Sequence, residues 1–197
     1  MTPPPLLLLD VDGVLNALSD HGEHRAAWPD WRRGSATSDG TSWPILWAPA
    51  VVDRLLAWHE AGQVEIQWLT TWGHDANGEL RALLGLPHLT VAGTYEDEGA
   101  EGWATQGMGV SHASVAPAAP DPLSGEWWKY DVVRRLLDQT DRRLIWVDDE
   151  LHRLTGRFRQ WADAHDRVLA VGPDPRVGLR AIDVAAINDL VQSGSCD

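Results

Sequence analysis

Three apolar segments of the sequence end in pairs of polar residues whose side chains could act together. The pairs are Asp10 with Asp12, Thr70 with Thr71, and Asp148 with Asp149. In parallel α/β sheets, ligands bind beyond the carboxyl ends of the strands, so we expect the four carboxylates to share one pocket. Like charges at close range are costly, and a divalent cation relieves that cost. Oxygen ligands with a substrate phosphate suit Mg²⁺, so the pattern indicates Mg²⁺-dependent phosphoryl chemistry.

The segments that must position these residues alternate between short apolar runs and amphipathic stretches. The expected strands are residues 6–9, 63–69, 89–92, 144–147 and 167–171. The expected helices run from Pro49 to just before Gly62, from a cap at Asp75 to Leu84, and over residues 127–138, 150–165 and 179–192. Strands that alternate with helices are typical of a parallel sheet covered on both faces. The predicted fold class is therefore α/β, with a Rossmann-like, five-stranded parallel sheet.

The length of 197 residues predicts a single domain, residues 1–197, with one insertion and one long loop. Residues 16–48 have little periodicity and are interpreted as a small cap insertion, expected over the mouth of the site because they follow Asp12 closely. Residues 93–125 are rich in Gly, Ala, Pro and acids, and are expected to form a long flexible loop. For the tryptophans of the insertion, packing against the core is favoured over stacking on a substrate base. These are Trp28, Trp31, Trp43 and Trp47.

The formal net charge of −13 argues against a general nucleic-acid binder, which normally carries a basic excess. A locally basic pocket remains compatible with this charge, because residues 129–167 hold 9 of the 16 lysines and arginines. No apolar run approaches the roughly 20 residues that a membrane span needs, so no membrane partner is expected. Cys196 is the single cysteine, which excludes an internal disulfide. We expect a cytoplasmic protein.

Four segments in order along the chain resemble the motifs of the haloacid-dehalogenase-like (HAD) phosphohydrolases. The first is Asp10-Val11-Asp12-Gly13-Val14-Leu15-Asn16, which follows an apolar strand. The others are Thr70 directly after Trp68-Leu69, Lys129 near the start of a later helix, and Asp148-Asp149 after Ile145-Trp146-Val147. The strings Leu69-Thr70-Thr71-Trp72 and Trp146-Val147-Asp148-Asp149-Glu150 further resemble a group related to the HAD domain of Swiss-army-knife RNA-repair proteins.

This resemblance implies a Mg²⁺-dependent phosphatase acting on a small phosphorylated substrate, with a nucleotide or a polynucleotide end as candidates. Asp10 would be the nucleophile that forms an aspartyl-phosphate, and Asp12 would protonate the leaving oxygen and then activate water. Thr70 would hydrogen-bond a phosphoryl oxygen, and Lys129 would neutralise the nucleophile and the transferring group. Asp10, the backbone carbonyl of Asp12, and Asp148 or Asp149 would hold Mg²⁺.

Each of these roles competes with a simpler interpretation. Asp148, Asp149 and Glu150 could be favourable first-turn acids of the next helix, a reading that can coexist with metal binding. Lys129 could be a surface residue, although a cation in the first turn of a helix opposes the macrodipole, and a locally broken rule often marks a functional site. Thr70 is favoured over Thr71 because it directly follows the apolar run.

Two further alternatives concern function. His21 and His24 lack the spacing of a metal site and are interpreted as structural or solvated. The whole chain could also be a non-catalytic HAD-fold protein, or a receiver-like module that binds phosphate and Mg²⁺. Receivers lack the Asp-x-Asp pair after the first strand, which favours the enzyme.

Overall fold

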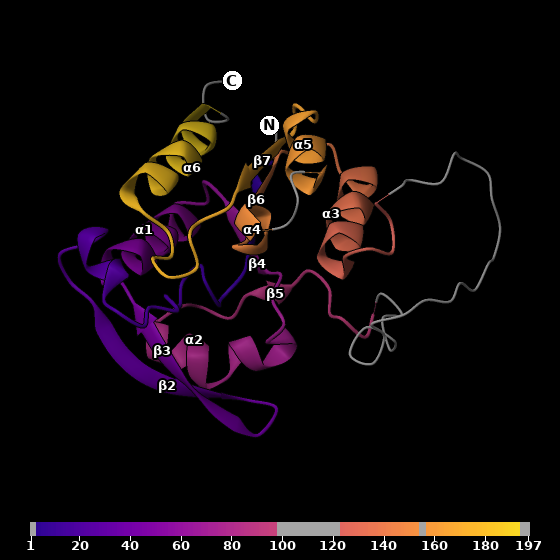
Figure 1. Cartoon of the computed structure of the whole chain (residues 1–197). Helices are drawn as coiled ribbons and strands as arrows, with labels where there is room; N and C mark the ends of the chain where they lie inside the picture. Colours follow the sequence, from indigo (N-terminus) through magenta and orange to yellow (C-terminus); the bar gives the residue numbers. More distant parts are fainter. Residues whose placement is uncertain (1–2, 98–122, 154–156, 194–197) are drawn as a thin grey trace.

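The fold is built on a five-stranded sheet in which every neighbouring pair of strands is parallel (Figure 1). The computed structural model describes residues 3–97, 123–153 and 157–193, so most of the expected 93–125 loop lies outside the described residues. The strands are β1 (Leu6–Leu9), β4 (Glu65–Trp68), β5 (Thr90–Val91), β6 (Leu144–Val147) and β7 (Val168–Val171). Their order is β5-β4-β1-β6-β7, with β1 in the centre. The predicted α/β class with a five-stranded parallel sheet is confirmed.

The two faces of the sheet are covered by different helices, which follows from the alternation of side chains along each strand. Leu7 and Leu9 of β1 belong to one core cluster, together with α1 (Pro49–Glu60) and α6 (Ala181–Ser193). Leu6 and Leu8 belong to the other, with α3 (Trp128–Gln139) and α5 (Arg157–Asp163). Figure 1 shows α1 and α6 on one side of the sheet and α3 and α5 on the other. All four leucines of β1 are buried, as a central strand requires.

The helix expected from Asp75 to Leu84 is wrong in its start. The structure has a 3₁₀ turn η2 (Gly73–Asn77) and then α2 (Glu79–Leu84), which is closed by Gly85 in a left-handed conformation. Asp75 caps neither helix with its side chain. Its carboxylate instead accepts hydrogen bonds from Ser38 Oγ at 3.3 Å and the Asp39 amide at 2.9 Å. The Asp75 carboxylate, which the local sequence predicts as a helix cap, therefore binds residues that are distant in the sequence.

The other boundaries differ by a few residues. The helix expected over 150–165 is described as α4 (Glu150–Arg153) and α5 (Arg157–Asp163). The strand expected over 89–92 pairs only at Thr90 and Val91. Among the described residues, no helix is both long and apolar enough to cross a membrane.

The segment expected as a cap contains a short 3₁₀ turn, η1 (Glu23–Ala26), and a β-hairpin of β2 (Arg32–Ser38) and β3 (Thr41–Trp47). Asp39 and Gly40 form its two-residue turn with φ angles of 49° and 69°. Two positive φ angles in succession match the twist of an antiparallel pair, and Asp-Gly is a favoured sequence for them. Figure 1 shows the hairpin beside α2. Its position over the mouth of the site stays a prediction.

The tryptophans of this segment pack against the core, with one exception. Trp47 is buried in the core cluster, and Trp28 and Trp31 are partly buried against it. The Trp28 indole also donates a 2.7 Å hydrogen bond to the Leu179 carbonyl. Trp43 is 51% exposed. The favoured packing interpretation therefore holds for three of the four and not for Trp43.

Candidate active site

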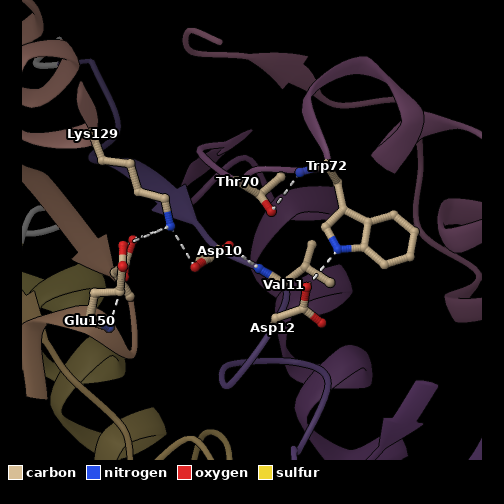
Figure 2. Close-up of polar contacts among 8 residues, drawn as sticks. Asp10, Val11, Asp12, Thr70, Trp72, Lys129 and Glu150 are labelled. Atoms are coloured by element: carbon tan, nitrogen blue, oxygen red, sulfur yellow. Dashed lines mark hydrogen bonds and ion pairs between the residues drawn. The ribbon is translucent and has the colours of Figure 1, made fainter. Parts of the chain in front are cut away.

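A buried lysine lies between two aspartates at the carboxyl end of the sheet. Figure 2 shows the Lys129 ammonium pointing at Asp10. Lys129 Nζ is 2.6 Å from Asp10 Oδ2 and 2.7 Å from Asp148 Oδ2. Lys129 is 2% exposed, Asp10 4% and Asp148 0%. The surface interpretation of Lys129 is therefore wrong. Lys129 is also the only lysine in the sequence, a signal that singles it out without any structure.

The register of the central strands explains why these side chains meet. Leu9 of β1 pairs with Val147 of β6, so Asp10 and Asp148 follow neighbouring strands at the same level. The Asp10 amide donates a 3.1 Å bond to the Val147 carbonyl, which continues the ladder to the site. Lys129 enters from the first turn of α3. The two carboxylates outweigh the unfavourable position of a cation at a helix N-terminus.

The electrostatics of this group are dominated by negative charge. Burial by itself lowers the pKa of Lys129, but the carboxylates of Asp10, Asp148 and Glu150 outweigh burial and raise that pKa above its usual value. Complete burial, with the Asp10 carboxylate in addition, raises the pKa of Asp148 well above its usual value in spite of the Lys129 ammonium. One ammonium thus faces an excess of carboxylates, which is the situation that a bound cation relieves.

Three of the four expected carboxylates do gather at one point. Oxygens of Asp10, Asp148 and Asp149 lie within 4.8 Å of one another, and all three residues are buried. Gly13 makes this approach possible, because a Cβ there would lie 2.6 Å from Asp149 Cγ. Its φ of 71° also favours glycine. We call Asp10, Lys129, Asp148 and Asp149 the charged cluster.

The first-turn interpretation of Asp148 also holds, and it coexists with membership of the cluster. Asp148 Oδ1 accepts a 2.9 Å bond from the Glu150 amide at the start of α4, while Oδ2 binds Lys129. The oxygen-only donor set of the cluster fits Mg²⁺ in its chemistry. Asp10, Asp148 and Asp149 are the side chains that could hold the ion.

Asp12 does not join the charged cluster, although it lies only two residues from Asp10. Its Oδ2 accepts a 2.8 Å bond from the Trp72 indole, and its Oδ1 accepts a 2.8 Å bond from Asn16 Nδ2. Figure 2 shows Lys129 and Trp72 on opposite sides of the segment from Asp10 to Asp12. We call Asp12, Asn16 and Trp72 the neutral-donor group. The predicted metal contact of the Asp12 carbonyl stays a prediction.

The choice between the two threonines favours Thr70. Thr70 is 1% exposed, and its Oγ1 accepts a 3.3 Å bond from the Trp72 amide. Thr71 is exposed. Trp72 therefore contacts both Thr70 and Asp12 (Figure 2). Sequence reasoning assigned no role to Trp72 or Asn16, although both lie inside the quoted motifs.

Several arginines of the basic stretch from 129 to 167 are used at the opposite end of the sheet. Arg142 donates to the carbonyl of Pro4 at 2.7 Å, just before β1, and pairs with Glu65 at the start of β4. Arg167 donates to the carbonyls of Thr140 and Leu137 before β6. These side chains bind the chain itself. Arg142 and Arg167 therefore do not supply the local basic surface for which the sequence left room.

The structural interpretation of His24 is confirmed. His24 is buried against the Trp31 ring at a centroid distance of 4.7 Å, and burial lowers its pKa below the usual value of 6.5. His21 is exposed, with its amide bound to Glu23. Neither belongs to the group of potential metal ligands found among the described residues.

Fold and site together define an HAD-like protein: a parallel sheet with β1 in the centre, and an acidic cluster with one lysine at its carboxyl end. The family model described as "HAD domain in Swiss Army Knife RNA repair proteins" matches residues 6–184, and the chain belongs to this family. HAD domains are generally phosphatases. No curated protein matches the chain. No solved structure matches it either.

Proposed function

We propose that the protein is a Mg²⁺-dependent phosphatase that hydrolyses a phosphomonoester through an aspartyl-phosphate on Asp10. The observation that carries this proposal is the buried Lys129 ammonium, held at 2.6 Å from Asp10 and 2.7 Å from Asp148. Burying a lysine between carboxylates is expensive, and truncating one partner of such a group is strongly destabilising. A catalytic role explains this buried arrangement better than a contribution to folding stability does.

Asp10 is placed to act as the nucleophile. Its Oδ1 accepts a 2.7 Å bond from the Val11 amide and its Oδ2 accepts the bond from Lys129, so the carboxylate is fixed in orientation. In the first step, a bond forms between an Asp10 oxygen and phosphorus, and the bond from phosphorus to the substrate's alcohol oxygen breaks. Lys129 would neutralise charge on the transferring group, and the Thr70 hydroxyl would donate to a phosphoryl oxygen.

Asp12 is proposed as the acid and base of the same reaction. It would give its proton to the departing alcohol oxygen, and then take a proton from the water that attacks the aspartyl-phosphate. The second step breaks the bond between phosphorus and Asp10, releases inorganic phosphate, and restores the Asp10 carboxylate and the protonated Asp12. The separation of Asp12 from the charged cluster supports these different roles, because Asp10 and Asp12 then meet different parts of the substrate.

A metal ion fits the charged cluster. Asp10, Asp148 and Asp149 would hold Mg²⁺, together with the backbone carbonyl of Asp12. When bound, the ion would stabilise negative charge on phosphoryl oxygens. This supports the proposal because Lys129 alone leaves an excess of carboxylates in the cluster.

The substrate is proposed to be a nucleotide or a phosphorylated polynucleotide end. The family description names RNA repair, which supports this class over sugar phosphates. The net charge of −13 favours recognition of a single end over binding along a strand. The alternative, a HAD-fold module that binds phosphate and Mg²⁺ without turnover, predicts ligand binding with no phosphate release.

The test is a phosphatase screen with the purified protein, with and without Mg²⁺. The substrates are nucleoside monophosphates, sugar phosphates, and oligonucleotides phosphorylated at the 3′ or the 5′ end. We expect Mg²⁺-dependent phosphate release that Asp10→Asn abolishes and that Asp53→Asn, a matched change on the exposed side of α1, leaves unchanged. No release from any substrate by the folded protein, or equal release by Asp10→Asn, would contradict the proposal.

A further inference from the structure

The Asp12 carboxylate is held by one neutral N–H donor on each oxygen, and we propose that Trp72 is its main positioning residue, with Asn16 as the second. Both bonds are 2.8 Å long. This inference rests on the proposed function, because positioning matters only if Asp12 transfers a proton. Each carboxylate oxygen has two acceptor sites, so Asp12 can keep both bonds while it meets the leaving oxygen.

The Trp72 ring is fixed well enough to hold another side chain. Trp72 is 5% exposed and belongs to the core cluster beneath the site. Its amide donates to Thr70 Oγ1 at 3.3 Å, and its carbonyl accepts a 3.0 Å bond from the Asp75 amide. The indole N–H therefore points at Asp12 from a backbone segment that is itself part of the site. One residue couples the position of Asp12 to that of Thr70.

The orientation of the Asn16 amide is fixed by its surroundings. Its Oδ1 accepts a 2.8 Å bond from the Leu46 amide, which can only donate. The amino group must then face its two acceptors, Asp12 Oδ1 at 2.8 Å and the Pro44 carbonyl at 3.3 Å. Asn16 thus links Asp12 to strand β3 of the hairpin. The hairpin therefore contributes to the site through this contact, whether or not it lies over the mouth of the site.

Positioning has a kinetic signature that a purely structural role lacks. A proton donor must lie within hydrogen-bond reach of the leaving oxygen, and a misplacement of about 1 Å costs about 100-fold. The benefit is largest for an alkyl alcohol, which leaves poorly without a proton, and small for p-nitrophenol, which leaves as a stable anion. The ratio kcat/KM reports the first step, transfer to Asp10, because the alcohol departs in that step.

The experiment compares Trp72→Phe with Trp58→Phe on p-nitrophenyl phosphate and on a nucleoside monophosphate. Trp58 is the matched control because it is equally buried and its indole donates to Asn188, away from the site. For Trp72→Phe we expect kcat/KM to fall about 10- to 100-fold on the alkyl ester and less than about 3-fold on the aryl ester. Trp58→Phe should show no split.

Equal losses on both esters, in a protein whose wild type is active, would overturn the inference and leave the phosphatase proposal intact. No wild-type activity on either ester or on any other substrate of the screen would contradict the phosphatase proposal instead. A readout without turnover then still tests the positioning bond: the indole ¹⁵N–H resonance that disappears in Trp72→Phe should shift in Asp12→Asn. An unchanged resonance would overturn the inference by itself.

Discussion

The end of β1 supplies two aspartates to two very different surroundings. Asp10 lies in the charged cluster, where its partners are the Lys129 ammonium and two further carboxylates. Asp12 lies in the neutral-donor group, where an indole and a primary amide bind its two oxygens. Residues two apart point to the same side only while the chain stays extended, and β1 ends at Leu9. A spacing of two residues after the strand therefore does not by itself make two side chains partners. Their neighbours decide what each can do.

The difference indicates two separate roles: the charged cluster supplies charge, and the neutral-donor group orients a carboxylate. The charged cluster can stabilise negative charge on a transferring phosphoryl group, because an ammonium in a buried site acts strongly. The neutral-donor group adds no net charge, and it holds a carboxylate in one direction. The following predictions test whether the two groups have these separate roles.

The largest expected effect separates the two aspartates. Asp10→Asn should lower kcat/KM on every ester by about 10⁴-fold or more, as removal of a nucleophile does. Asp12→Asn should still transfer phosphate from p-nitrophenyl phosphate to Asp10, but hydrolyse it slowly. Stopped-flow kinetics should therefore show a burst of p-nitrophenol for Asp12→Asn and none for Asp10→Asn. A burst in both variants would remove the distinction between the two groups.

The next effect concerns stability of the charged cluster. Lys129→Met leaves Asp10 and Asp148 buried without their ammonium, so we expect a loss of about 3–5 kcal/mol in the free energy of unfolding. Arg159→Met removes an exposed i,i+4 pair with Asp163 and should cost only about 0.3–0.5 kcal/mol. Urea unfolding followed by circular dichroism measures both. Similar losses for the two variants would show that the ammonium does not compensate two buried carboxylates in the charged cluster.

Metal binding sharpens the same comparison. Mg²⁺ well above its dissociation constant should raise the melting temperature of the wild type by about 5 °C or more, since a ligand stabilises the state it binds. Asp149→Asn should remove most of this shift, while Trp72→Phe should keep it, because Trp72 belongs to the neutral-donor group. NaCl at equal ionic strength is the control. A full shift in Asp149→Asn would take Asp149 out of the metal site.

The smallest expected effect comes from a residue near Asn16 of the neutral-donor group. A hollow of about 430 Å³ is lined by Asn16, the loop after it, and the hairpin, including Arg33. Arg33→Ala should lower kcat/KM for a phosphorylated oligonucleotide about 5-fold, as the loss of one exposed charge contact of about 1 kcal/mol would. It should spare p-nitrophenyl phosphate. Arg32→Ala, on the other face of the hairpin, is the matched control, and equal effects would exclude this contact.

The sequence predicts the sheet well because apolar strands and their polar ends are local features. Leu6–Leu9 and Leu144–Val147 have the predicted bounds, and the register between them then brings Asp10 and Asp148 together. The sequence does not predict the hairpin, although Asp39-Gly40 is a favoured turn sequence. Its strands lack a long alternating pattern because one face carries Gly34 and Ala36 against α2 instead of large apolar residues.

The roles of Asp75, Asn16 and Trp72 depend on partners far away in the sequence. Asp75 accepts from the hairpin turn instead of capping a helix, and Trp72 reaches Asp12 across 60 positions. Such contacts leave no local periodicity to detect. Lys129 is the opposite case, because a cation in the first turn of a helix is locally unfavourable and therefore conspicuous. A residue that violates a local helix preference, such as Lys129, therefore indicates the site better than residues that follow local preferences.

The central claim is that phosphate passes through Asp10, and trapping that intermediate tests it most directly. Asp12→Asn is mixed with Mg²⁺ and a ³²P-labelled substrate, quenched in acid, digested, and analysed by mass spectrometry. We expect one hydroxylamine-sensitive acyl phosphate per protein, on the peptide that contains Asp10, and none in the double variant with Asp10→Asn. Phosphate release by the wild type without label on that peptide, or label on Asp148 or Asp149, would contradict the account.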